Sequence, residues 1–358
     1  MSADRPAGGL DVPGGTGRSS GRPPALGRPA RSRERSARTG AAGLSTSARL
    51  AILLGLTLAA VVAFYAIGSA GNWDFVIPFR TRRLGALVIV GLAIAVSTVL
   101  FQTVTENRIL TPSIMGFDSM YALIQTVLVF GLGSMTLNLI PVTARFGLEL
   151  ALMLGFSFLL FRWLFGGARR SLYLLVLVGI VFGVLFRSLA TFMQRIIDPN
   201  EYLVLQDRLF ASFNAVDPTL LGVCAVIVVV VSVPVWRRRQ VLDVLTLGRD
   251  NATALGVEYR REVLGVLAIV SVLVSVSTAL VGPITFFGLL VANLAYQLMG
   301  THRHAVILPA AALLGVLTLV GGQVLLEHAF GLDTVLSVVI EFVGGIVFIL
   351  LLVRGGRR

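Results

Sequence analysis

Long apolar stretches recur along this 358-residue chain from about residue 48 onward, and they constrain its fold more than any motif does. An α-helix needs about 20 consecutive apolar residues to cross the hydrocarbon core of a membrane. With 56% hydrophobic and 13% charged residues, the chain also differs from an ordinary soluble domain. We therefore predict an all-α polytopic membrane protein with about ten transmembrane helices. The predicted spans are residues 49–69, 84–105, 113–133, 146–165, 172–194, 217–236, 262–281, 282–299, 305–328 and 334–353.

The first 47 residues differ from the rest of the chain. They are rich in Gly, Pro, Ser and Arg and hold few large apolar side chains, so they cannot bury enough surface to offset chain entropy. We predict a disordered basic tail at 1–47 and a transmembrane domain at 48–358. The tail either contacts anionic lipid headgroups or is an extension without a role. The apolar stretch Ala48 to Gly68 is interpreted as the first transmembrane helix rather than a cleaved signal.

Every one of the 30 basic residues is an arginine, and the chain holds no lysine. A Walker-type phosphate loop and Schiff-base chemistry both require lysine, so neither is available. Most of the arginines flank apolar stretches, which fits orientation in a membrane better than nucleic-acid binding. With ten spans and a cytoplasmic N-terminus, most arginines fall on the inside and both termini are cytoplasmic. Only Gly282-Pro283 separates the seventh and eighth spans, so a count of nine, with the termini on opposite sides, stays open.

The segment 237–261 is the longest polar interval among the apolar stretches. Arginine clusters stand at both of its ends, and between them lies a short amphipathic pattern. A segment of this kind is too short and too charged to cross a membrane, so the pattern predicts a cytoplasmic surface helix offered to a soluble partner. A helix lying on the lipid headgroups is the alternative.

Several strings appear in order along the chain. The first half holds Arg80, Arg83, Gln102, Thr105, Asn107, Pro112 and Gly116, and the second holds Leu247-Gly248, Ala252, Leu255-Gly256, Gly282-Pro283-Ile284-x-Phe286-x-Gly288-Leu289 and His302-Arg303-His304. In these strings the chain resembles the FecCD/BtuC-like permeases of ABC importers for iron–siderophores and cobalamin. It departs from the family pattern at Arg82, Glu106 and Arg108, which stand for proline, arginine and proline.

The resemblance implies a type II ABC importer (BtuC-like) permease fold in a bacterial cytoplasmic membrane. It also implies a second permease subunit, ABC ATPase subunits that use ATP-Mg, and an extracytoplasmic substrate-binding protein. This chain would bind no cofactor and no metal and would catalyse no chemistry. Its expected cargo is a ferric siderophore, with cobalamin or haem as alternatives. A secondary transporter driven by an ion gradient and a membrane scaffold without transport activity remain rival interpretations.

The same resemblance assigns roles to particular residues. It implies that Leu247, Gly248, Ala252, Leu255 and Gly256 couple the chain to the ATPase. On the outer side it implies that Arg80 and Arg83 receive acidic residues of the binding protein. Anchoring of these two arginines at the membrane interface is the alternative.

Polar residues within the spans are expected to line the translocation pathway or its gate, since they are costly in hydrocarbon. The candidates within the spans are Gln102, Arg187 and Glu341, and Asn107, just after the second span, is a further candidate. Arg187 is expected to pair with Glu341 or with Glu149. A buried pair that only holds helices together is the alternative. By resemblance, 195–216 would form an outer gating helix.

Residues typical of enzymes are sparse. The histidines His302, His304 and His328 do not form a metal-binding motif, and Cys224 stands alone in an apolar span. We interpret Cys224 as a small buried side chain.

Overall fold

The computed structural model describes residues 45–67, 73–165, 172–214, 216–328 and 336–355, and residues 44–358 form one compact unit. Most of the predicted tail 1–47 therefore lies outside the described residues. Within them all regular secondary structure is helical. The elements are α1 Thr46–Ala66, α2 Trp73–Thr105, the 3₁₀ turn η1 Pro112–Met115, α3 Phe117–Leu139, α4 Val142–Phe165, α5 Leu172–Gln194, α6 Pro199–Leu209, α7 Pro218–Arg237, α8 Arg239–Leu245, α9 Arg249–Ala254, α10 Tyr259–Val281, α11 Phe287–Met299, α12 His304–His328 and α13 Leu336–Gly355.

Eight of these helices are long and apolar enough to cross a membrane: α1 to α5, α7, α10 and α12. Two shorter apolar helices, α11 and α13, complete the predicted set, so the prediction of about ten spans is confirmed. The seventh and eighth spans are separate helices because Gly282 has a φ of 106° and Pro283 offers no backbone N–H. The second span begins earlier than predicted, since α2 runs from Trp73 and includes the arginines at 80 to 83.

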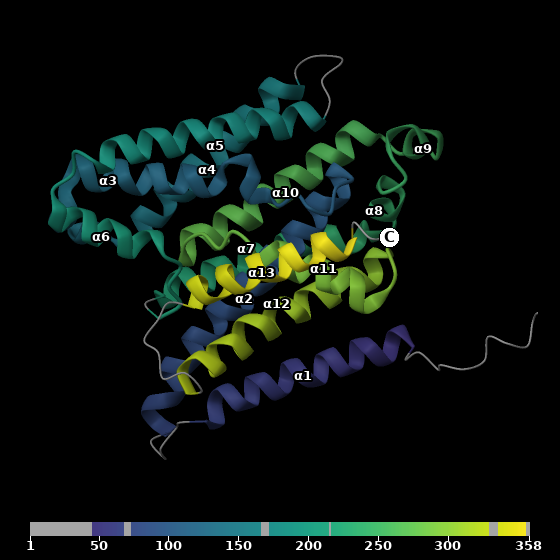
Figure 1. The fold of residues 1–358 in the computed structure, drawn as a ribbon, viewed down its shortest axis with the longest axis horizontal. Helices are drawn as coiled ribbons and strands as arrows, with labels where there is room; N and C mark the ends of the chain where they lie inside the picture. Colours follow the sequence, from purple (N-terminus) through teal and green to yellow (C-terminus); the bar gives the residue numbers. More distant parts are fainter. Residues whose placement is uncertain (1–44, 68–72, 166–171, 215, 329–335, 356–358) are drawn as a thin grey trace, which may run out of the picture. The chain divides into compact units, whose positions relative to one another are not determined.

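The short helices mark the two ends of the bundle (Figure 1). Helices α8 and α9 lie at one end and α6 at the opposite end, and α1 begins and α13 ends at the α8/α9 end. Contacts agree with this arrangement, because the Arg49 side chain near the start of α1 donates a hydrogen bond to Leu298 O at the end of α11. The assignment of the α8/α9 end to the cytoplasm stays a prediction.

Helices α2 and α12 pack closely at the centre of the bundle, with α10 also against α2 and α1 also against α12. At Gly91 and Gly315 the backbones of α2 and α12 contact each other directly. A Cβ atom on Gly315 would collide with the carbonyl oxygen of Gly91, and one on Gly91 would lie 3.0 Å from the carbonyl carbon of Gly315. Small residues at a helix interface permit such an approach in membranes. We call this pair of residues the glycine seam.

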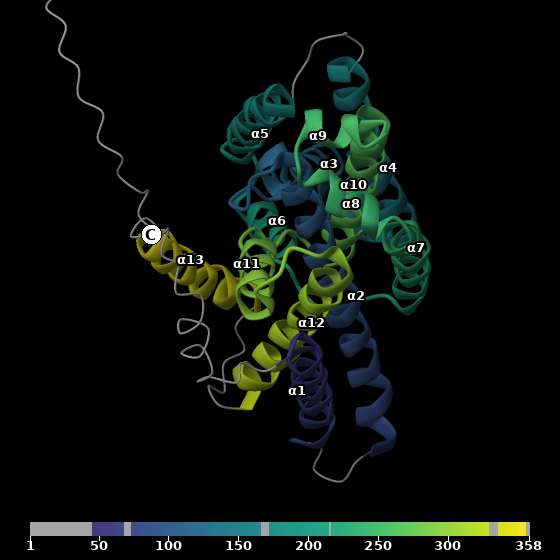
Figure 2. The same ribbon diagram turned by 90° about the vertical axis from the view of Figure 1, so that its right-hand side faces the viewer.

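Helices α5 and α13 lie toward one side of the bundle, away from α7 (Figure 2). Both expose large apolar side chains there, including Val184 at 62% and Phe342 at 70% of their full surface. We call the exposed surfaces of these two helices the α5/α13 face. Its exposed apolar residues include Val181, Val184, Leu185 and Phe192 on α5, and Phe342, Val343, Ile346 and Ile349 on α13.

Candidate functional site

The segment 237–261 forms two short helices, α8 and α9, where one surface helix was predicted. The chain turns between them at Gly248, whose φ is 85°, and again after α9 at Gly256, whose φ is 83°. Left-handed backbone of this kind favours glycine. A side chain at Gly248 would also begin 3.7 Å from the carboxylate oxygens of Glu106, so the turn brings the segment against the end of α2.

The apolar residues of this segment divide into two sets. Leu242, Leu245 and Ala252 are buried against the rest of the protein. Leu247 and Leu255, in contrast, are 52% and 63% exposed. Of the five residues predicted to couple to an ATPase, Ala252 therefore packs inward. The other four (Leu247, Gly248, Leu255 and Gly256) form what we call the coupling surface.

A chain of hydrogen bonds ties α8 to the helices beneath it. Asp243 Oδ1 lies 2.7 Å from both the backbone N and the Nδ1 of His304. On the other side of the ring, His304 Nε2 lies 2.7 Å from Thr103 Oγ1 on α2. His304 is 1% exposed, so α8, α12 and α2 are joined through a buried imidazole. We call this the Asp243–His304–Thr103 chain.

Sequence reasoning placed His304 in a family string and considered it as a metal ligand, and it missed this chain. Its members are separated by 61 and 201 residues, so no local spacing marks them. Among the described residues no group of three or more His, Cys, Asp or Glu side chains could hold a metal ion. Cys224 is fully buried.

Gln102 and Asn107 hold the turn that follows α2. The amide Nε2 of Gln102 donates a hydrogen bond of 2.7 Å to Arg108 O, and Asn107 Oδ1 accepts one of 2.9 Å from the backbone N of Ile109. Gln102 is buried, whereas Asn107 is exposed near the α8/α9 end. Their assignment to the translocation pathway stays a prediction.

At the opposite end of the bundle, Arg80 and Arg83 are engaged within the chain. Arg80 Nη1 donates to Phe64 O and Ile67 O at 2.5 and 2.7 Å, and so satisfies carbonyl groups left free where α1 ends. The Arg83 side chain forms an ion pair with Glu327 on α12. Their role in docking a binding protein stays a prediction.

Arg82 differs from both of these neighbours. It is exposed on α2 and makes no hydrogen bond or ion pair with another described residue. The sequence shows Arg82 as a departure from the family pattern, but it carries no signal that this arginine would be the one left accessible.

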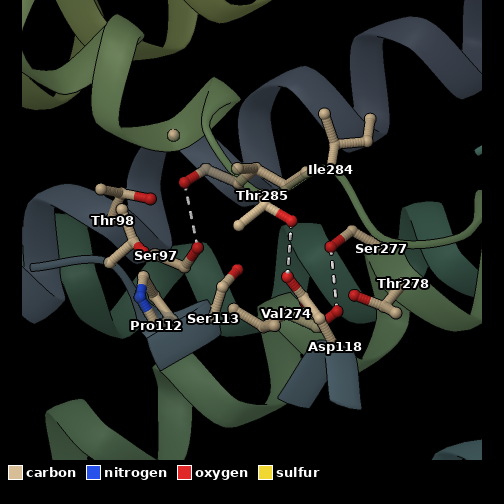
Figure 3. Close-up of a pocket in the computed structure, with 13 residues that line it drawn as sticks. Ser97, Thr98, Pro112, Ser113, Asp118, Val274, Ser277, Thr278, Ile284 and Thr285 are labelled. Carbon is tan, nitrogen blue, oxygen red and sulfur yellow. Dashed lines mark hydrogen bonds between the residues drawn. The ribbon is translucent and has the colours of Figure 1, made fainter. Parts of the chain in front are cut away.

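A polar cavity of about 20 Å³ lies between α2, α10 and the starts of α3 and α11. Asp118 is its one charged residue, and hydroxyl groups supply most of its polar lining. Figure 3 shows Asp118 and Thr285 joined by a hydrogen bond of 3.1 Å, with Ser97 on one side and Ser277 on the other. We call this the hydroxyl cavity. Sequence reasoning missed Asp118, although an acidic residue within a predicted span is the signal that could have found it.

Arg187 and Glu341 both lie near the hydroxyl cavity. Each acts electrostatically on the Asp118 carboxylate, and Glu341 Oε1 accepts a hydrogen bond of 3.4 Å from the backbone N of Thr285. The two side chains come from α5 and α13, so the fold brings these predicted pathway residues to one region. Within the described residues Arg187 forms no ion pair of 4 Å or less with Glu341 or with Glu149.

Glu149 belongs to a different site. It is buried on α4 and accepts a hydrogen bond of 2.7 Å from Gln125 Nε2. Beside it lies a second cavity of about 230 Å³, which Arg145 and Arg208 also line. Burial lowers the pKa of the Arg208 guanidinium on α6, and the charge of Arg145 lowers it further.

Comparison with known proteins decides the family. Residues 39–354 match the FecCD transport family. The chain belongs to that family. The resemblance drawn from the ordered sequence strings is therefore confirmed.

Curated relatives of this FecCD protein are permeases of import systems. The petrobactin import system permease protein YclO of Bacillus subtilis is 45% identical over 86% of this chain and 98% of its own length. The petrobactin import system permease protein FatC of Bacillus anthracis is 40% identical over 78% of this chain and 79% of its own length. The vitamin B12 import system permease protein BtuC of Vibrio parahaemolyticus is 29% identical over 77% and 81%.

The fold also has a solved counterpart. An ABC transporter assigned to the metal-chelate type, solved in an inward-facing conformation, gives a TM-score of 0.74. The match covers 86% of this chain and 99% of that one at 23% identity. It shows that the helices have the fold of an ABC importer permease.

Proposed function

We propose that this chain is the permease subunit of an ATP-driven importer that carries a ferric siderophore of the petrobactin type across a bacterial cytoplasmic membrane. The observation that carries the proposal is the 45% identity to a petrobactin permease over 98% of that protein's length. Cobalamin is the weaker alternative, since the vitamin B12 permease compared above is 29% identical.

The coupling surface is the proposed contact with the ATPase subunits. Exposed leucines at the end of a bundle are suited to a hydrophobic groove on a soluble partner. Beneath them, the Asp243–His304–Thr103 chain would carry a displacement of α8 into α12 and α2. The partner would bind and hydrolyse ATP-Mg, and this chain would convert that displacement into alternating access.

The α5/α13 face is the proposed contact with a second permease subunit. Arg187 is exposed there among apolar side chains, and an arginine facing lipid is costly. A second subunit would remove this face from lipid and leave Arg187, Glu341 and Asp118 at the wall of a pathway between the subunits.

The outer end is the proposed contact with a substrate-binding protein. Arg82 is the most accessible charge of the arginine cluster on α2, and it would meet acidic residues of that protein. Arg80 and Arg83 would contribute by holding the end of α2 against α1 and α12.

The decisive experiment is co-purification of the tagged chain with its ATPase subunit, followed by ATP-dependent uptake of ferric petrobactin in proteoliposomes. Replacing Leu255 by glutamate places a charge at the proposed contact, and we expect the retained ATPase to fall more than about tenfold. Leu203→Glu on α6 is the matched control, since Leu203 is 66% exposed at the opposite end. It should leave ATPase retention unchanged.

Two outcomes would contradict the proposal. Equal loss of the ATPase in both variants would mean that the added charge, and not its place, is responsible. Uptake driven by an ion gradient, with no ATPase present, would establish the secondary transporter instead.

A further inference from the structure

The hydroxyl cavity lies beside two breaks in the helical structure, one between α2 and α3 and the other between α10 and α11. Ser277 and Thr278 belong to the last turn of α10, and Asp118 belongs to the first turn of α3. The C-terminal end of a helix carries a partial negative charge. The starts of α3 and α11 carry partial positive charges that offset it, so the Asp118 carboxylate is the charge in this cavity that would attract a cation.

Three hydroxyl groups around the cavity have already used their hydrogens. Ser97 Oγ donates to Ile94 O at 3.0 Å, Ser277 Oγ donates to Val274 O at 2.9 Å, and Thr285 Oγ1 donates to Asp118. A hydroxyl group has one donor and two lone pairs, so these three groups offer only lone pairs to the space between them. These three groups, together with the Asp118 carboxylate, thus present acceptors to an occupant of the cavity.

The Asp118 carboxylate also lacks a cationic partner at contact distance. Within the part of the chain that the structure describes, no arginine or histidine nitrogen lies within 4 Å of it. Arg187 acts on it from farther away, and the nearby Glu341 adds a second negative charge. Two carboxylates with one guanidinium leave this region one positive charge short.

The size of the cavity restricts its occupant. A volume of about 20 Å³ is enough for one water molecule or one ion of similar size. Divalent ions are normally held by several charged oxygen ligands or keep several waters, and one carboxylate with neutral hydroxyls provides neither. Asp118 and Ser113 line the cavity and are each partly exposed.

We propose that the hydroxyl cavity binds one dehydrated monovalent cation, with sodium as the ion of matching size, held by Asp118 and by hydroxyl oxygens that include those of Ser97 and Ser277. The ion joins the start of α3 to α2 and to the end of α10. This role goes beyond the proposed function, because neither ATPase contact nor siderophore recognition requires it.

Binding of radioactive ²²Na⁺ to the purified full-length chain in lipid nanodiscs tests the proposal. We expect saturable binding that excess NaCl displaces and choline chloride does not. Asp118→Asn removes the charged ligand and should weaken this binding by at least about tenfold. Sodium should also raise the thermal unfolding midpoint of the wild type by about 2–4 °C relative to choline, and this shift should vanish in Asp118→Asn.

Two further variants make the result specific. Glu149→Gln is the matched control, because Glu149 is a buried carboxylate outside the cavity, and it should bind sodium as the wild type does. Ser277→Ala keeps the carboxylate but removes one neutral ligand, so its sodium affinity should lie between those of the wild type and Asp118→Asn. It also provides the test if Asp118→Asn does not fold.

Absence of saturable sodium binding in the wild type would overturn the proposal, and so would unchanged binding in both Asp118→Asn and Ser277→Ala. A protonated Asp118 beside a water molecule is the competing arrangement. It would make the unfolding midpoint depend on pH and not on sodium, which would also overturn the proposal.

Discussion

The two ends of the helical bundle use their polar side chains in opposite ways. At the α8/α9 end, buried hydrogen bonds hold the segment from beneath through His304, and Leu247 and Leu255 are left exposed above them. At the other end, Arg80 and Arg83 in the first part of α2 are themselves engaged by the end of α1 and by α12. Among the proposed contact residues, those that remain accessible are therefore leucines at one end and an arginine at the other.

The difference shows that residue type alone does not identify a docking residue. Arg80 and Arg83 match the family pattern and Arg82 does not. Of these three arginines, however, Arg82 is the one that forms no hydrogen bond or ion pair with another described residue. A side chain that already forms hydrogen bonds or ion pairs within its own chain is less available to another protein than one that does not. Three substitutions test this contrast between the ends.

The largest effect is expected at the α8/α9 end. Asp243→Ala removes the acceptor for the buried His304, which should lower the free energy of unfolding by about 1–3 kcal/mol. Because the coupling surface stays intact, the ATPase should remain bound while ATP-driven uptake falls about tenfold or more. The measurement is uptake per ATP hydrolysed in proteoliposomes. Asp250→Ala, an exposed change on α9, is the control and should behave as the wild type.

A smaller effect, on stability alone, is expected from the engaged arginine at the opposite end. Arg83→Ala leaves Glu327 without its ion-pair partner in a half-buried site, and we expect it to lower the free energy of unfolding by about 1–3 kcal/mol. Thermal unfolding of the purified chain measures this. Arg82→Ala is the matched control and should change that free energy by less than about 0.5 kcal/mol. Equal effects of the two substitutions would remove the distinction between engaged and accessible arginines.

The smallest effect concerns docking itself. Arg82→Glu should weaken association with the binding protein by about two- to fivefold, since an exposed charge at the rim of an interface contributes little. The loss should be larger at low salt than at high salt, as measured by surface plasmon resonance. Arg261→Glu, at the opposite end, should leave this association unchanged. No change with Arg82→Glu would place the docking site elsewhere on the outer surface.

The sequence was sufficient for the helices but not for most contacts between them. Stretches of about 20 apolar residues mark a membrane span directly, and the segment 195–216 contains α6, a helix too short to be one. Asp118 could have been found by the same reasoning, as an acid inside an apolar stretch. The partners of Arg83 and His304 could not have been found in this way. Glu327 lies 244 residues from Arg83 in the sequence, and Asp243 and Thr103 lie 61 and 201 residues from His304. Only the packed structure brings such groups together.

The glycine seam has a consequence for any motion that links the two ends. At Gly91 and Gly315 the backbones of α2 and α12 meet directly, so at this crossing neither helix has a side chain of its own that could rearrange as one slides past the other. We expect α2 and α12 to tilt together as one rigid body that rotates about this crossing. A small displacement of α8 would then move the far ends of the same two helices, where the ion pair between Arg83 and Glu327 joins them.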